Sequence, residues 1–153
     1  MPTFLIAGIL ASFFALVLEL LLGSIPGFEY AEPRTGLTDP GTLAPLTLFL
    51  FAVIEEVTKF SVLRKISLNK EVHDIFPSGS VIFALGFGAT EATLAFLKFS
   101  DAPILALAGI IALHGATILL YGYGIGKHFS KPLFVIVLGM GIIAHFLYNM
   151  ILA

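Results

Sequence analysis

The chain has 153 residues, of which 58% are hydrophobic and 12% are charged, and its mean hydropathy is +1.04. Soluble domains of this size carry about twice that charge, so the composition is typical of an integral membrane protein. The net charge of −2 excludes the basic surface that nucleic-acid binding needs, and the lack of cysteine excludes disulfides, thiolate metal sites and cysteine nucleophiles.

Five apolar stretches follow one another along the chain, at about residues 3–23, 43–63, 81–98, 103–126 and 133–153. Each has roughly the 20 residues that a helix needs to cross a bilayer, where a helix satisfies its own backbone hydrogen bonds. The first is long and has no basic residue before it, so we interpret it as an anchoring span and not as a signal peptide. The sequence predicts an all-α membrane protein with a single domain, residues 1–153, built as a bundle of about five transmembrane helices.

Basic residues in the connecting segments predict the orientation of the bundle. One side has Arg64, Lys65, Lys70, Lys127 and Lys131, whereas the other has Arg34 and Lys98. Because basic residues are retained on the cytoplasmic side, we expect a cytoplasmic N-terminus and an external C-terminus. A compact chain without cysteine fits a prokaryotic plasma membrane. We also expect the Pro-Ser-Gly-Ser run at residues 77–80 to form a turn into the third span.

Acidic and imidazole side chains occur at similar depths in four of the stretches. Counting 1.5 Å of rise per residue from the cytoplasmic end places Glu56 and Glu55 at roughly 12 and 14 Å, Glu91 at about 15 Å, and His114 and His145 at about 18 Å. This coincidence near the middle of the membrane predicts that these side chains share a functional site. Glu19, near the outer end of the first stretch, is interpreted as a structural residue that snorkels or faces the bundle.

The ionisable residues of the second stretch raise the question of charge balance. A charged side chain at the centre of a transmembrane helix costs on the order of 3 kcal/mol. Lys59 follows Glu56 by three residues and Glu55 by four, which places the side chains on one helix face. We predict a structural ion pair between Lys59 and Glu56. One lysine cannot neutralise Glu55, Glu56 and Glu91 together, so at least one carboxyl group must be protonated, hydrated, or bound to a cation or a histidine.

Glutamate and histidine, without cysteine or a Ser–His pairing, point to the activation of water. A buried glutamate can act as a general base, and a histidine can hold a metal ion or donate to an oxyanion. Asn149, one helical turn after His145, is a candidate second oxyanion donor. Zn²⁺ could bind to Glu91, His114 and His145 and keep one position open for water. The sequence leaves metal-bound and metal-free water as alternatives.

Four short motifs occur in order on consecutive stretches. They are EExxK at residues 55–59, FxxxE from Phe87 to Glu91, His114 followed by a GxG run at residues 122–124, and HxxxN from His145 to Asn149. Together they resemble the PrsW family of intramembrane proteases, which belongs to the superfamily of CAAX proteases and Abi proteins. The resemblance covers about residues 43–153. The chain departs from the family pattern at Ala92, where asparagine is frequent.

The resemblance implies an intramembrane endopeptidase that cleaves a membrane-anchored peptide or protein. The groups at its centre would be Glu55 or Glu56, Glu91, His114 and His145. By analogy, Glu55 would be the base that activates water, and Glu56 would be paired with Lys59. Asn149 and His145 would stabilise the oxyanion.

Two other functions fit the same residues. The chain could be a non-catalytic scaffold or binding subunit, because the superfamily also resembles the scaffold subunit of γ-secretase. It could be a proton-coupled carrier, because buried glutamate and histidine also build proton relays, although five spans without inverted repeats argue against this. The expected surroundings are the lipid bilayer, a membrane-anchored substrate and, as an open alternative to a monomer, further copies of the chain.

Overall fold

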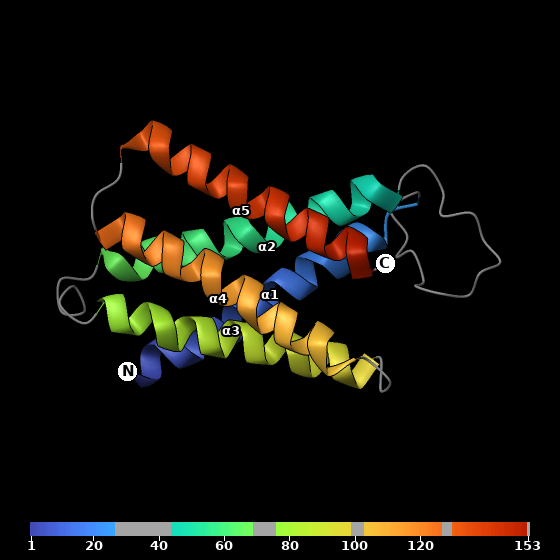
Figure 1. Ribbon diagram of the computed structural model, residues 1–153, viewed down its shortest axis with the longest axis horizontal. Helices are drawn as coiled ribbons and strands as arrows, with labels where there is room; N and C mark the ends of the chain where they lie inside the picture. Colours follow the sequence, from blue (N-terminus) through green and yellow to red (C-terminus); the bar gives the residue numbers. More distant parts are fainter. Residues whose placement is uncertain (27–43, 69–75, 99–102, 127–129, 153) are drawn as a thin grey trace.

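The described part of the chain forms five α-helices. The computed structural model describes residues 1–26, 44–68, 76–98, 103–126 and 130–152, which contain α1 (Pro2–Gly23), α2 (Ala44–Ser67), α3 (Phe76–Lys98), α4 (Ile104–Gly126) and α5 (Lys131–Leu152) (Figure 1). No strand occurs in these described ranges. Each helix lies close to one of the five predicted stretches, which confirms the all-α fold.

Four of the five helices are long and apolar enough to cross a membrane, as expected of an integral membrane protein. The four segments are Pro2–Gly23, Ser78–Lys98, Ile104–Ile125 and Lys131–Ile151. The exception, α2, is equally long at 24 residues but carries Glu55, Glu56, Lys59, Arg64 and Lys65. It therefore depends on its neighbours to cover its charges. The orientation of the termini and the source of the membrane stay predictions.

The packing of the helices places the middle of α2 inside the bundle. α3 packs along both α1 and α4, and α2 packs along both α1 and α5 (Figure 1). α4 also contacts α2 and α5, so each of the five helices packs against at least two others. As a result Glu55, Glu56 and Lys59 are each no more than 5% exposed. The three charged side chains in the middle of α2 are thus withdrawn from the outer surface, whereas Arg64 and Lys65 near its end are exposed.

Glycine lets α1 and α3 approach each other closely. A Cβ atom added to Gly8 would overlap the carbonyl oxygen of Phe83, and one added to Gly86 would lie 2.6 Å from the carbonyl oxygen of Leu5. Both neighbours are backbone atoms, which cannot turn aside as a side chain can. Membrane helices depend on such close contacts because lipid provides no hydrophobic drive for their association. This contact sets the register between α1 and α3.

The prediction of a turn at residues 77–80 is wrong. These residues lie at the start of α3, which begins at Phe76. A proline in the first turn of a helix is tolerated, because the N–H that it lacks would have no partner within the helix. A Cβ atom at Gly79 would overlap the ring of Phe4, so this glycine makes space for a fully buried aromatic side chain.

The apolar core is built mainly from aromatic side chains. Its fully buried members include Phe4, Leu63, Phe83, Phe87, Ile118 and Tyr121. Tyr121 differs from the others because it brings a hydroxyl group into this core, and a buried hydroxyl group needs a hydrogen-bond partner. That partner belongs to the candidate site.

Candidate active site

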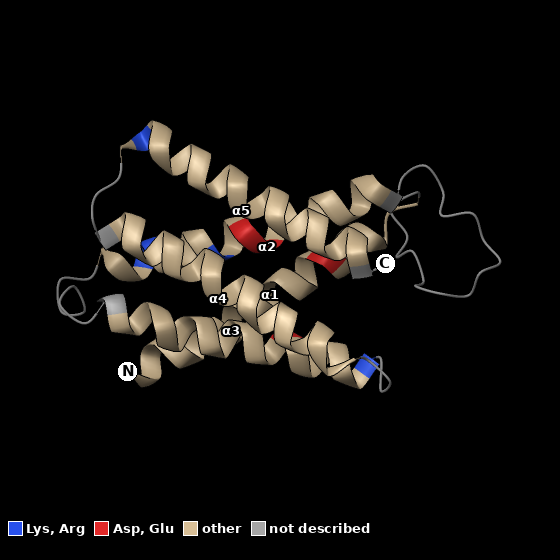
Figure 2. Ribbon diagram, viewed as in Figure 1, with Lys and Arg blue, Asp and Glu red and all other residues tan. Residues whose placement is uncertain are grey.

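Ionisable side chains meet in the interior of the bundle. The acidic residues of the described helices lie along its middle, whereas most Lys and Arg residues lie near helix ends (Figure 2). The buried ionisable residues are Glu55, Glu56, Lys59, His114 and His145, each no more than 5% exposed. With Glu91 of α3, which contacts His114, they form a group that we call the polar cluster.

Glu56 is the centre of the hydrogen-bond network. Its Oε1 accepts a hydrogen bond from Lys59 Nζ at 2.5 Å and lies 2.9 Å from His145 Nδ1. Its Oε2 accepts a hydrogen bond from the Tyr121 hydroxyl at 2.7 Å. The expected ion pair between Lys59 and Glu56 is therefore present. One carboxylate joins α2 to both α4 and α5.

Lys59 has a second favourable contact. Its Nζ lies 5.0 Å from the centroid of the Phe87 ring, within the range of a cation–π interaction. The same ring lies 5.2 Å from the imidazole of His114. Phe87, the first residue of the FxxxE motif, thus contacts both the ammonium group of Lys59 and the ring of His114.

The bonds of Glu56 determine which nitrogen of His145 carries a proton. An ionised carboxylate only accepts hydrogen bonds, and Glu56 already accepts them from an ammonium group and a phenol. His145 Nδ1 must therefore be the donor toward Glu56 Oε1. In a neutral imidazole the other nitrogen, Nε2, is then an acceptor. It lies 3.4 Å from Glu55 Oε1, so two acceptor atoms face each other.

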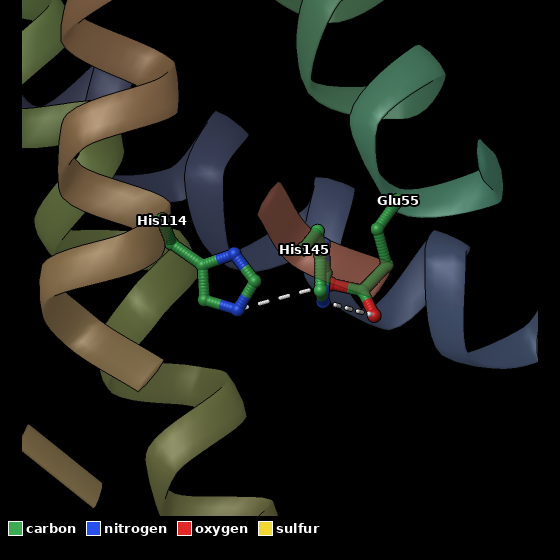
Figure 3. A group of neighbouring side chains, drawn as sticks. All are labelled: Glu55, His114 and His145. Atoms are coloured by element: carbon green, nitrogen blue, oxygen red, sulfur yellow. Dashed lines mark ion pairs between the residues drawn. The ribbon is translucent and has the colours of Figure 1, made fainter. Parts of the chain in front are cut away.

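Glu55 approaches both histidines, whose rings lie 5.1 Å apart, and the dashed lines of Figure 3 join each imidazole to its carboxylate. Oε1 is 3.4 Å from His145 Nε2, and Oε2 is 3.8 Å from His114 Nε2. Both distances are longer than a hydrogen bond of about 2.7–3.2 Å. Oε2 has no hydrogen-bond partner within the described chain. The carboxyl group of Glu55 is thus buried and still able to accept a proton or bind a cation.

Glu91 joins the polar cluster through His114. Its Oε2 lies 3.6 Å from His114 Nε2, and its Oε1 accepts a hydrogen bond from Ser12 Oγ at 3.1 Å. Ser12 is fully buried and belongs to α1. His114 Nδ1 is buried without a hydrogen-bond partner among the described residues. The tautomer with its proton on Nε2 suits this setting, because the proton then points toward the carboxyl groups.

Glu19 of α1 faces the bundle, one of the two placements expected of it, and its Oε1 is buried. Its carboxyl group interacts electrostatically with that of Glu91 and lies within reach of that of Glu55. Its Oε1 has no hydrogen-bond partner in the described part of the chain. Carboxyl groups from α1, α2 and α3 therefore face the same part of the interior, while Lys59 is engaged by Glu56. This excess of carboxyl groups favours the binding of a proton or a cation.

Asn149 lies on α5, one turn after His145, and its side chain is half-buried. No hydrogen bond joins it to the polar cluster within the described residues. Its role as an oxyanion donor stays a prediction.

Tyr121 and Ser12 belong to the network, but the sequence analysis did not single them out. Both residue types are frequent in membrane helices and carry no charge. Their burial is therefore not costly enough to make them stand out in an apolar sequence. One signal was available for Tyr121. It follows His114 by seven residues, two turns along the same face of α4.

Glu55, His114 and His145 are the set of potential metal ligands that the described residues contain, with one ligand atom of each within 4.8 Å of the others. Glutamate with two histidines is a donor set of catalytic zinc sites. Two ligands at tetrahedral angles on one zinc ion are roughly 3.4 Å apart, close to the distances from Glu55 to the histidines. Glu56 holds Nδ1 of His145, as an outer carboxylate does at many metal sites. The residues fit zinc, but with Glu55 in this set where we expected Glu91.

The chain matches no protein-family model, no curated protein and no solved structure. The resemblance to the PrsW family therefore depends on the four motifs alone.

Proposed function

We propose that this chain is an intramembrane endopeptidase that hydrolyses a peptide bond of a membrane-anchored substrate with water activated at Glu55. The observation that supports the proposal is the state of its carboxyl group. It is 5% exposed, it faces His114 and His145, and its Oε2 has no hydrogen-bond partner in the described chain. An unsatisfied buried polar group costs about 1–3 kcal/mol, so such a group is more readily explained by function than by stability.

The two adjacent glutamates differ in what they can do. Glu56 accepts hydrogen bonds on both oxygens, from Lys59, His145 and Tyr121. It has little capacity left to take a proton from water. Glu55 has unoccupied acceptor positions beside two imidazole rings. This difference supports Glu55 as the base and Glu56 as a structural carboxylate, the same division that the family resemblance implies.

In the proposed reaction, water attacks the carbonyl carbon of the scissile peptide bond while Glu55 accepts one of the protons of the water. The carbonyl oxygen becomes an oxyanion, and His114 Nε2–H is the donor with the suitable tautomer. His145 Nε2 is an acceptor while Nδ1 donates to Glu56, so His145 orients the water instead of stabilising the oxyanion. The C–N bond then breaks, and Glu55 returns its proton to the leaving amine. Asn149 is the candidate second donor.

Zinc is the alternative means of activating water at the same place. Bound to Glu55, His114 and His145, Zn²⁺ supplies Lewis acidity and a more acidic water. Glu91 Oε2, at 3.6 Å from His114 Nε2, is then the carboxyl oxygen that remains to accept a proton.

The test is cleavage in a bilayer. The purified chain is reconstituted in nanodiscs with single-span peptides of varied sequence, and new termini are identified by mass spectrometry in water enriched in oxygen-18. We expect the wild type to place one oxygen-18 atom in each new C-terminus. Glu55→Gln should lose at least about 100-fold in rate, because a general base contributes roughly 10²–10⁴-fold. Lys65→Gln, at an exposed position of α2, is the matched control and should cleave normally.

Wild-type cleavage rates in a folded Glu55→Gln variant would contradict the proposal. A scaffold would produce no new termini and would retain a stoichiometric partner through purification. A proton-coupled carrier would move protons into liposomes without cutting any peptide.

A further inference from the structure

Tyr121 is distinguished from the other core aromatic residues by the partner of its hydroxyl group. The side chain is fully buried in α4, and the hydroxyl donates to Glu56 Oε2 at 2.7 Å. No other hydrogen bond of this hydroxyl is found within the described residues. Tyr121 therefore touches the carboxylate that holds His145, and it does so on the oxygen that His145 does not use.

We propose that Tyr121 is a positioning residue for His145. By holding Glu56 Oε2, the phenol keeps Oε1 directed at His145 Nδ1. Nδ1 then keeps its proton, and Nε2 faces Glu55. The importance of this geometry for catalysis rests on the proposed endopeptidase function, but the effect of Tyr121 on the imidazole does not.

The carboxylate needs such a partner because the last torsion of a glutamate side chain is broad. Without the phenol, Oε2 of Glu56 would be buried with no donor. Lys59 lies on the same helix at the end of a flexible side chain, and its ammonium can then bridge both oxygens. The carboxylate would turn toward the lysine, and His145 Nδ1 would lose its acceptor. The proton of His145 would no longer be confined to Nδ1.

Gly141 of α5 makes space for the Tyr121 hydroxyl. A Cβ atom built at position 141 would overlap this hydroxyl oxygen, whereas it would lie 3.2 Å from Cζ of the ring and 3.3 Å from Glu56 Oε2. Gly141→Ala should therefore displace the hydroxyl from Glu56. In the Tyr121→Phe background the hydroxyl oxygen is absent, and a small shift of the phenyl ring is enough to accommodate the methyl group that Gly141→Ala adds. The two substitutions should consequently not be additive, whereas substitutions without a shared contact usually are.

A second pair of residues offers a matched control. The Tyr148 hydroxyl donates to the backbone carbonyl of Ala106 at 2.6 Å, and a Cβ atom at Gly109 would lie 2.5 Å from this hydroxyl. Tyr148 and Gly109 thus repeat the tyrosine–glycine contact between α4 and α5 without touching the polar cluster. Tyr148→Phe removes the same chemical group from the same helix pair.

The decisive measurement is nitrogen NMR of the full-length chain, labelled with ¹⁵N-histidine, in nanodiscs. The signals of His145 are assigned with the His145→Gln variant. In the wild type we expect a protonated Nδ1 and an unprotonated Nε2. In Tyr121→Phe and in Gly141→Ala we expect a mixture of tautomers. The double variant should resemble Tyr121→Phe, and Tyr148→Phe should resemble the wild type.

Kinetics provide the second readout. Loss of the direct outer partner of a metal-ligating histidine typically costs 10–100-fold. Tyr121 acts one contact further out, through Glu56, so we expect kcat of Tyr121→Phe to fall by about 10-fold while KM stays within about threefold. A histidine spectrum that is the same in Tyr121→Phe and the wild type would overturn the positioning role, whatever the rate. If the spectrum changes in Tyr121→Phe but the wild type cleaves no peptide, the positioning role of Tyr121 stands and the proposed endopeptidase function is contradicted. If Tyr121→Phe does not fold, the spectrum of Gly141→Ala decides.

Discussion

Glu56 Oε1 and His145 Nδ1 lie 2.9 Å apart, although 89 residues separate them in the sequence. The bond ties α2 to α5, and Lys59 and Tyr121 support it from the other sides of the carboxylate. It explains how neighbouring glutamates on one helix come to differ. Glu56 is fully bonded, and Glu55 meets the far side of the same histidine at 3.4 Å with acceptor positions to spare.

Lys59→Met should destabilise the protein by about 3–5 kcal/mol, because it leaves the Glu56 carboxylate buried without its cation. The measurement is denaturant unfolding of the solubilised protein. Lys65→Met, at an exposed position of the same helix, should change the free energy of unfolding by less than about 0.5 kcal/mol. The double variant Lys59→Met/Glu56→Gln removes the unpaired charge and keeps an acceptor oxygen for its neighbours, so it should recover part of the loss. A double variant as unstable as Lys59→Met would show that the lysine stabilises by another route.

Ser12→Ala should lower the free energy of unfolding by about 0.5–1.5 kcal/mol, because it removes a part-buried hydrogen bond to Glu91 Oε1. Ser24→Ala is the control, since its hydroxyl is exposed and, within the described residues, bonds to the carbonyl oxygen of Leu21 alone. Both variants are compared by unfolding under the same conditions. Equal stability of the two variants would mean that α1 contributes no polar contact of consequence.

Gly8→Ala should destabilise the bundle by about 1–3 kcal/mol, because the added methyl group would overlap the backbone of Phe83. Gly139→Ala has no atom within 4 Å of the added group, so it should be neutral or stabilising by up to about 1 kcal/mol through helix propensity. Thermal unfolding followed by circular dichroism compares them. A tolerated Gly8→Ala would show that α1 and α3 can separate without harm.

Added Zn²⁺ should raise the melting temperature of the wild type, because Glu55, His114 and His145 can bind it in the folded state. At about 100 times the dissociation constant, the stabilisation should be about 2.7 kcal/mol. Glu55→Gln and His145→Ala should each lose most of this shift, whereas Lys65→Gln should retain it. A shift that survives in Glu55→Gln would place the ion elsewhere.

Depth in the membrane could be predicted from the sequence, because a helix rises by a constant amount per residue. The coincidence of Glu55, Glu91, His114 and His145 followed from that count. Which helices are neighbours could not be derived in this way, because packing depends on side-chain contacts around each helix and not on rise. For this reason the sequence did not predict that Glu55, and not Glu91, approaches both histidines.

Uncharged partners were harder to predict than charged ones. A charged residue in an apolar stretch is rare because its burial is costly, so its presence indicates a function. Residues with a hydroxyl group are common in membrane helices, and their presence indicates nothing in particular. Ser12 and Tyr121 therefore became visible only through their bonds to Glu91 and Glu56. The turn expected at residues 77–80 failed for a local reason. Proline, serine and glycine are as compatible with a helix N-terminus as with a loop.

The contact between Lys59 and Glu56 lies within a single helix, and this has a consequence for biosynthesis. The ribosome completes α2 before it synthesises Tyr121 of α4 and His145 of α5. During that interval the partner that Glu56 already has is carried by α2 itself, three residues away. Glu56 therefore has a cationic partner on its own helix from the time α2 is complete. A cationic partner carried by α4 or α5 instead would leave Glu56 unpaired until that later helix is made.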